Sequence, residues 1–266
     1  MTEAYIYDAV RTPRGKGKKS GSLHEITALS LATQVLQAIR DRNELDTSKV
    51  DDVVLGCVSP VGEQGADIAR VAVLNADYAE TTAGVQVDRF CASGLEACNM
   101  AASKVMTGEA DMAIGGGVES LSLVSRSGHM NLHRYTEDEL MKKWPAIWMT
   151  MIETAEIVAD RYGVSREYQD EYSAESQKRT AAFQEKGYMA EEIVPLKTTM
   201  KLVNKETGEE TLQEVVCDRD ECNRPGTTFE SLSGLKPVFS GGMVVKEGKY
   251  VTAGNASQLS DGSAAV

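Results

Sequence analysis

The sequence predicts an α/β fold, a sheet covered by helices, with a mostly helical segment inserted into it. Short apolar segments alternate with helix-like segments over the first 122 residues, which is typical of strands linked by crossover helices. The chain has 266 residues, of which 42% are apolar and 26% are charged. A chain of this length and composition can bury a sizeable core without disulfides or metal, so we expect it to fold.

The elements of the first half follow one another in a regular order. Residues 4–10 (AYIYDAV) are predicted to form a strand, and a basic loop at 11–19 leads to a helix at about 25–40 whose apolar residues recur near the 3.6-residue period. The next elements are a strand in DDVVLGCV, a helix at 66–76, a strand in AGVQVDRF, a helix at 92–107 and a strand in DMAIG. Because parallel neighbours need long crossovers, this alternation favours a parallel sheet.

The composition changes after Ser122, which indicates an insertion. We expect residues 1–122 to form the first α/β half, 123–250 an inserted loop domain, and 251–266 a return to the α/β half. Helical patterns dominate the insertion from about 150 to 187. Ser165 is a plausible N-cap for a helix there, and Gly187 is a plausible stop.

The charge balance excludes several classes of partner. The chain carries 28 basic and 40 acidic residues, a net charge of −12, which repels nucleic acid and anionic lipid over most of the surface. An anionic small molecule can bind where a few Arg or Lys residues reverse the field. Glu3 and Asp8 break any signal-peptide pattern, no apolar stretch is long enough to span a membrane, and five irregularly spaced cysteines fit reduced thiols. We therefore expect a cytoplasmic protein.

Cys91 stands where a predicted strand turns directly into a predicted helix. The free N–H groups and the positive dipole end of a helix N-terminus stabilise a thiolate. Small residues follow in Ala92, Ser93 and Gly94 and leave room for a substrate. A nucleophilic cysteine is the functional interpretation, and an inert buried thiol, which we expect of Cys57 and Cys98, is the alternative.

The motifs RFCASGLEA, GGGVESLS and AGNASQLSDGSAAV follow one another along the chain. In that order they resemble the nucleophile segment, the glycine-rich segment after it and the end of the N-terminal half in the thiolases, the family of the acetyl-CoA acetyltransferases and 3-ketoacyl-CoA thiolases. RTPRGKGKKSGSL and SREYQDEYSAESQ are also thiolase-like, so the matches cover nearly the whole chain in family order. Asp88 departs from the pattern, because thiolases usually carry Asn, Ser or Thr there.

The resemblance implies a layered thiolase-like fold and a role for four residues. Cys91 would accept the acyl group, Arg224 in NRPGTTFESL would contact the CoA nucleotide, and Ser257 in GNAS would bond the pantetheine arm. Met151, in an apolar cluster at 141–151, would line the acyl and pantetheine tunnel, with core of the insertion as the alternative. CoA would be a substrate bound by the inserted domain, and no cofactor is implied. For Arg224 the alternative is a solvated surface arginine.

The resemblance also implies residues that this sequence lacks. Thiolases carry a histidine in Gly-His-Pro and a second cysteine in Cys-x-Gly, and neither motif occurs here. We therefore expect an N-terminal portion without the second half, poorly active by itself, and a homo-oligomer, dimer or tetramer, when complete. His129, His133 and Glu137 have a helical ligand spacing, but nothing else supports a metal, and we expect none.

The leading hypothesis is thus a CoA-dependent thiolase that works through an acyl-cysteine on Cys91, in thiolysis of 3-ketoacyl-CoA or condensation of acetyl-CoA. A ketoacyl synthase-like condensing enzyme is one alternative, although the long insertion favours CoA. A non-catalytic CoA-binding or assembly module is the other. Acyl transfer to Cys91 would discriminate between an enzyme and a binding module.

Overall fold

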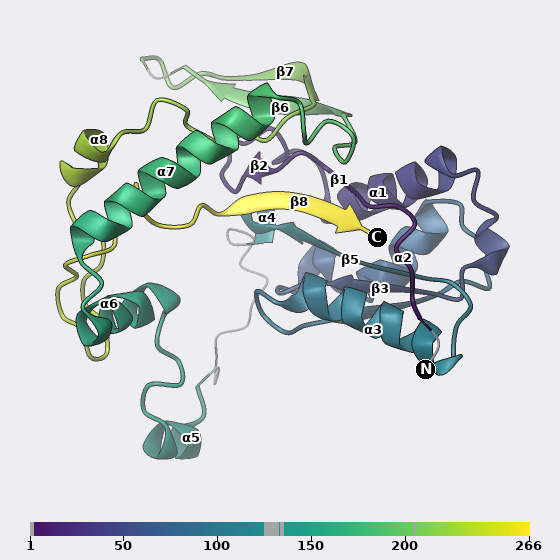
Figure 1. The fold of residues 1–266 in the computed structure, drawn as a ribbon, viewed down its shortest axis with the longest axis horizontal. Coiled ribbons are helices and arrows are strands. Elements are labelled where there is room, and N and C mark those ends of the chain that lie inside the picture. Colours follow the sequence, from purple (N-terminus) through teal and green to yellow (C-terminus); the bar gives the residue numbers. More distant parts are fainter. Residues whose placement is uncertain (1–2, 125–132, 134–135, 205) are drawn as a thin grey trace. The chain divides into compact units, whose positions relative to one another are not determined.

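The computed structural model describes residues 3–124, 133, 136–204 and 206–266, which fall into two compact units. The first unit comprises residues 1–130, 189–222 and 258–266, and the second comprises 131–188 and 223–257. Figure 1 gives the element labels used below.

A six-stranded sheet forms the centre of the first unit. Its strands lie in the order β1-β8-β5-β3-β4, and β2 pairs with β8 beside β1. β3, β4 and β5 are parallel, whereas β8 is antiparallel to β5, β1 and β2. The bounds are β1 Val10–Arg11, β2 Gly15–Lys16, β3 Asp52–Gly56, β4 Ala83–Val87, β5 Ala113–Ser120 and β8 Ser260–Ala265.

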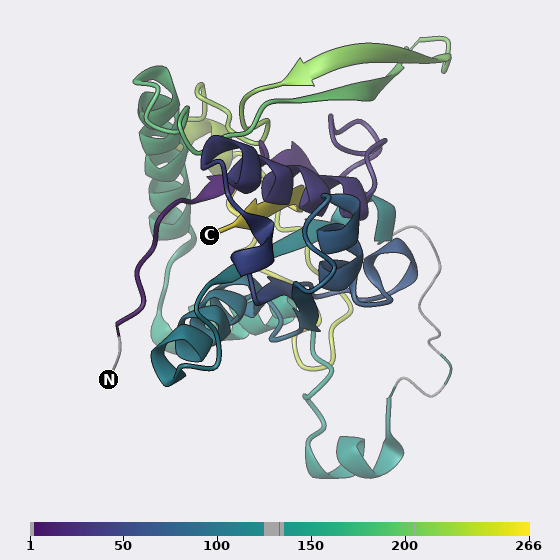
Figure 2. The ribbon, with the colours of Figure 1, turned by 90° about the vertical axis from the view of Figure 1, so that its right-hand side faces the viewer.

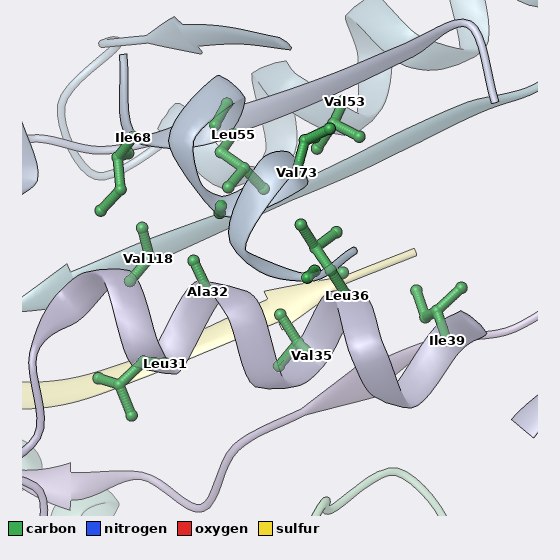
Figure 3. Close-up of a cluster of buried hydrophobic side chains, with 14 of the residues drawn as sticks. Leu31, Ala32, Val35, Leu36, Ile39, Val53, Leu55, Ile68, Val73 and Val118 are labelled. Carbon is green, nitrogen blue, oxygen red and sulfur yellow. The ribbon is translucent and has the colours of Figure 1, made fainter. Parts of the chain in front are cut away.

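Helices cover both faces of this sheet, and the alternation of side chains along β3 decides which residues meet them. Val53 and Leu55 join a buried cluster with the helices α1 and α2, whereas Val54 packs against Ala97 and Ala101 of α3 on the opposite face. Figure 3 shows the first cluster, to which α1 contributes Leu31, Val35 and Leu36. The helices are α1 Ala28–Arg42, α2 Ile68–Asn75, α3 Ser93–Thr107 and the short α4 Leu121–Val124, with single 3₁₀ turns at Thr47–Lys49 and Gly62–Gln64.

Two expectations about the sheet are wrong. The predicted strand at 4–10 is limited to Val10–Arg11, because β8 offers partners only to these residues, and Tyr5, Ile6 and Tyr7 are exposed. The sheet is mixed rather than parallel. The chain enters β8 after the second unit, without a crossover helix from β5, so nothing forces these two strands to run parallel.

A long hairpin of β6 (Leu196–Val203) and β7 (Glu210–Cys217) also belongs to the first unit. Its strands run side by side in antiparallel register (Figure 2). Leu196 and Cys217 at its base join the main core, and the segment around it is tied down by Arg11, which pairs with Glu192 and Asp220. The expected 123–250 insertion is therefore divided between the two units in the structure.

The second unit is mostly helical, with α5 Asp138–Lys143, α6 Met151–Tyr162, α7 Arg166–Glu185 and α8 Phe229–Ser233. Ser165 caps α7 by accepting a hydrogen bond from the N–H of Tyr168, as its sequence predicts. Gly187, the expected stop, adopts a left-handed conformation with φ of 71° just past the helix end. Among the described residues, no helix combines the length and the apolar character needed to cross a membrane.

Candidate functional site

Cys91 lies in a short turn between the end of β4 at Val87 and the start of α3 at Ser93, as predicted. Its side chain is exposed. The turn follows β4, an edge strand of the sheet, at the carboxyl end of its parallel pairing with β3, where the two strands are in register up to Gly56 and Val87. The sulfur is therefore presented at an edge of the sheet, next to the N-terminus of a 15-residue helix.

Side chains on both sides of Cys91 fix this turn. The carboxylate of Asp88 accepts a hydrogen bond from the N–H of Phe90 at 2.8 Å. The hydroxyl of Ser93 accepts one from the N–H of Arg89 at 2.8 Å and donates one to the carbonyl of Phe90 at 2.6 Å. These bonds hold Phe90 at φ of 49°, a left-handed conformation that disfavours a bulky side chain. The nucleophile candidate thus follows a strained residue that its neighbours hold in place.

Gly56 explains how the helix approaches the sheet so closely. A Cβ at this position would lie 2.3 Å from the carbonyl carbon of Ser93 and 2.6 Å from the nitrogen of Gly94. Any other residue would push the first turn of α3 away from β3. The glycine at the end of β3 therefore determines where the helix N-terminus and the Cys91 turn can lie.

The other four cysteines are placed differently. Burial raises the pKa of Cys57 to about 11, and burial also raises the pKa of the half-buried Cys98. Cys217 and Cys222 are buried in the first unit. Cys91 is thus the exposed thiol of the five, and the expectation that Cys57 is an inert buried thiol agrees with its position.

A buried network supports the same edge of the sheet and was not singled out from the sequence. Gln64 is fully buried; its amide donates to Glu119 at 2.7 Å, and its carbonyl oxygen accepts from the N–H of Ser120 at 2.5 Å. Glu119 also accepts from the N–H of Val58 at 2.8 Å. The network thereby joins the segments that follow β3 and β5. Glu119 lies in the glycine-rich GGGVES segment, but no local signal marks Gln64.

Met151, Arg224 and Ser257 all lie in the second unit, whereas Cys91 lies in the first. Met151 begins α6 and is 75% exposed, so it is not part of a core. Arg224 is exposed, and its N–H donates to the side chain of Gln177 on α7 at 2.8 Å. Among the described residues its guanidinium makes no ion pair. Ser257 is exposed in the loop that follows Asn255.

The described residues hold no group of three or more side chains suited to a metal ion. His129 lies outside the described residues, so its spacing to His133 and Glu137 is not tested. Glu137 caps the short helix α5, and His24 bonds to the hydroxyl of Ser122 at 3.0 Å.

Comparison with known proteins decides the family. A family model described as "Thiolase, N-terminal domain" matches residues 4–266. The chain belongs to the thiolase family. It is 39% identical over 266 residues to the 3-ketoacyl-CoA thiolase of Bacillus subtilis (strain 168), covering 100% of this chain and 65% of the relative. A beta-ketoadipyl-CoA thiolase of Acinetobacter baylyi is 39% identical over 280 residues, with 100% of this chain and 66% of the relative covered.

A thiolase structure matches as well. The crystal structure of the Bacillus anthracis acetyl-CoA acetyltransferase superposes with a TM-score of 0.78 at 33% identity, covering 100% of this chain and 65% of that chain. The predicted α/β, thiolase-like fold is thereby confirmed. This thiolase chain spans 65% to 66% of the length of the relatives named above.

Proposed function

We propose that this thiolase chain takes part in CoA-dependent acyl transfer and that Cys91 accepts the acyl group. One observation carries the proposal: the exposed cysteine of the chain lies at the N-terminus of α3, in a turn that Asp88 and Ser93 hold. The names of the three relatives, two CoA thiolases and an acetyl-CoA acetyltransferase, support an acyl-CoA substrate. Their names also favour CoA over the carrier protein of a ketoacyl synthase.

The first step on acetyl-CoA is a thioester exchange. The Cys91 thiolate attacks the carbonyl carbon, a C–S bond to the enzyme forms, and the C–S bond to CoA breaks, so that CoA leaves as its thiolate and takes up a proton. With a 3-ketoacyl-CoA, the bond that breaks is the C–C bond beside the attacked carbonyl, and the leaving acetyl-CoA carbanion must be protonated. The backbone N–H of Cys91 itself would help to stabilise the oxyanion.

The second unit supplies the residues proposed to hold CoA. Arg224 would bind the nucleotide phosphates, and its exposed guanidinium provides a local positive charge on a chain with a net charge of −12. Ser257 would bond the pantetheine arm, and Met151 would lie against it. CoA is a substrate in this proposal, and no resident cofactor or metal is required.

The acid–base groups of the thiolase reaction are not among these 266 residues, because neither Gly-His-Pro nor Cys-x-Gly occurs. General acid–base help is worth about 10²–10⁴-fold in rate. We therefore propose that these 266 residues by themselves are acylated slowly and turn over poorly, and that the protein works as a cytoplasmic homo-oligomer. A non-catalytic CoA-binding module remains the alternative function, and it predicts no acylation.

Acylation of Cys91 is the direct test. The chain is incubated with excess acetyl-CoA, and intact mass with peptide mapping is expected to show one acetyl group on Cys91. Cys91→Ser should abolish it, because a serine hydroxyl without a base is barely nucleophilic. The matched control is Cys98→Ser, which removes the half-buried thiol on α3, the helix that follows Cys91, and should leave acetylation unchanged. Acetylation that persists in Cys91→Ser would contradict the proposal.

A further inference from the structure

The helix α7 carries a stripe of polar side chains that bind other segments of the second unit. Asp170, Gln177 and Gln184 lie seven residues apart, which brings them to the same face of the helix. Asp170 bonds to Asn255, Gln177 to the backbone of Arg224 and Gln184 to the side chain of Asn223. Asp170 is the one buried residue of the 20 in α7, so apolar packing does not explain how this helix is held.

The first contact fixes the loop that carries Ser257. Asp170 accepts a hydrogen bond from the side-chain amide of Asn255 at 3.0 Å, and the same amide donates to the carbonyl of Tyr250 at 2.9 Å. The side-chain oxygen of Asn255 accepts from the N–H of Thr252 at 2.7 Å. Asn255 therefore uses both ends of its side chain to close the loop two residues before Ser257.

Arg166 extends this contact to the end of α8. It pairs with Asp170 at 2.7 Å and donates to the carbonyls of Leu232 and Leu235 at 2.8 and 3.0 Å. Gly254 lies against the same segment, because a Cβ there would be 2.4 Å from the side chain of Leu232. The Ser257 loop thus rests on α7 through an ion pair whose carboxylate, that of Asp170, is almost fully buried.

The second contact fixes the segment that carries Arg224. The N–H of Arg224 donates to the side-chain oxygen of Gln177 at 2.8 Å. The carbonyl of Arg224 accepts from the N–H of Thr227 at 3.0 Å, which closes a turn. Asn223 donates to Gln184 at 2.9 Å one residue earlier. The backbone of Arg224 is anchored while its guanidinium remains exposed.

We propose that α7 is a spacer that sets the distance and orientation between the two CoA-contacting segments of this chain, with Asp170 and Gln177 as positioning residues. The inference rests on the proposed function, in which Ser257 meets the pantetheine arm and Arg224 the nucleotide phosphates. Seven helical residues separate the two anchors by about 10 Å along the helix axis. A rigid helix holds that separation before the ligand arrives, which lowers the ordering cost of binding a long, flexible molecule.

Substitution of each anchor should then weaken the binding of a different end of CoA. A merely structural role of Asp170 and Gln177 would not separate the two ends in this way. Gln177→Met keeps the side-chain length and removes the acceptor for the N–H of Arg224. Asp170→Asn keeps the shape, but its single oxygen cannot serve both Arg166 and Asn255. Anisotropy of a fluorophore-labelled CoA gives the affinity for the whole ligand. Competition with adenosine 3′,5′-bisphosphate and with pantetheine gives the affinity for each end.

We expect Gln177→Met to weaken the binding of adenosine 3′,5′-bisphosphate by about 3–10-fold, the effect of one hydrogen bond, and to leave the affinity for pantetheine unchanged. Asp170→Asn should weaken the binding of pantetheine and leave that of adenosine 3′,5′-bisphosphate unchanged. Both variants should bind labelled CoA more weakly. Ser176→Ala, an exposed and neutral change on the same turn of α7, is the matched control and should change neither fragment.

Circular dichroism and thermal melting establish that each variant is folded. If Asp170→Asn does not fold, Gln177→Met decides the proposal by itself, because Gln177 is only half-buried. If a folded Gln177→Met chain lost affinity for both fragments equally, or for neither, the proposal that α7 is a spacer would be overturned. Failure of the unsubstituted chain to bind labelled CoA would instead overturn the proposed function, so the two failures are distinguishable.

Discussion

The residues around Cys91 do separate tasks within one short turn. Asp88 supplies a hydrogen-bond acceptor for the N–H of Phe90, which is the task that Asn, Ser or Thr can perform at this position in thiolases. The departure from the family pattern therefore keeps the local bond and adds a negative charge. Ser93 bonds to the backbone of Arg89 and Phe90 and offsets the cost of the left-handed conformation of Phe90.

At the same scale we predict that Arg224→Ala weakens CoA binding, and more strongly at low salt. The residue is exposed, and it must attract a polyanion to a chain with a net charge of −12, so its contribution is screened as ionic strength rises. Calorimetry at two ionic strengths measures the effect. The control is Arg161→Ala, an exposed arginine on α6. An affinity that is unchanged at both salt concentrations would make Arg224 a solvated surface residue.

The roles of single residues were only partly accessible from the sequence. Cys91 was found because a strand and a helix meet there, and both elements have local signals. Gln64 was missed, since its partners Glu119 and Ser120 lie more than 50 residues away and nothing in its own segment indicates burial. Asp170 was missed for the same reason, because its partner Asn255 is 85 residues further along the chain.

Among the elements, α6 shows how a helix can order a loop without a large apolar contact. Glu153 accepts hydrogen bonds from the N–H groups of residues 243–245, and Glu156 accepts them from residues 249–251. Both glutamates are almost fully buried. One helix turn thereby supplies acceptors for two consecutive bends of the segment that leads to Ser257.

We predict that this arrangement is lost in acid. Burial alone would raise the pKa of Glu153, but its bonds to the N–H groups of Val244, Val245 and Met243 outweigh burial and lower the pKa below the ordinary value of 4.5. A carboxylate whose pKa is lowered in the folded chain stabilises the folded state, and this stabilisation is fully present at pH values above the pKa of the group in the unfolded chain. That stabilisation is lost as the pH falls through the pKa of the group in the folded chain.

The measurement compares melting temperatures of the unsubstituted chain and Glu153→Gln from pH 7 down to pH 3. The substituted chain should melt at a lower temperature near neutral pH, because its amide offers one acceptor where the carboxylate has two. The difference should shrink below about pH 4.5 as Glu153 takes up a proton. Glu185→Gln, at an exposed position on α7, is the control and should show no such convergence. A difference that stays constant down to pH 3 would contradict the prediction.

Elements with complete local signals were predicted well, and elements that depend on partners were not. The helices α1, α2, α3 and α7 begin within three residues of the predicted positions, since periodicity and caps are local. The segment 4–10 has a strand pattern, yet only its last residue, Val10, and the following Arg11 pair with β8 to form β1. The antiparallel direction of β8 likewise depends on where the chain returns after the second unit, which no window of sequence contains.

At the scale of the whole molecule, the two units are stabilised differently. The first unit has a continuous apolar core that includes residues of α1, α2, β3 and β5. In the described part of the second unit the buried apolar side chains are Ala159, Leu232 and Val251, whereas Glu153, Glu156 and Asp170 are buried and hydrogen-bonded. Burial of apolar surface is the larger source of stability, at about 25 cal/mol per Å². The second unit is therefore expected to be the less stable.

We predict that the chain unfolds in two steps in urea, the second unit first, and that CoA delays only the first step. Hydrogen exchange read by mass spectrometry reports the two units separately, through peptides from α6 and α7 and from β3 and β5. A ligand that binds one folded unit at about 100 times its Kd stabilises that unit by about 2.7 kcal/mol. Protection of α6 and α7 should thus persist to higher urea with CoA, and that of β3 should not change. If all four elements lost protection at the same urea concentration, with or without CoA, the chain would be a single cooperative unit. The two units would then not differ in stability as the difference between their buried residues predicts.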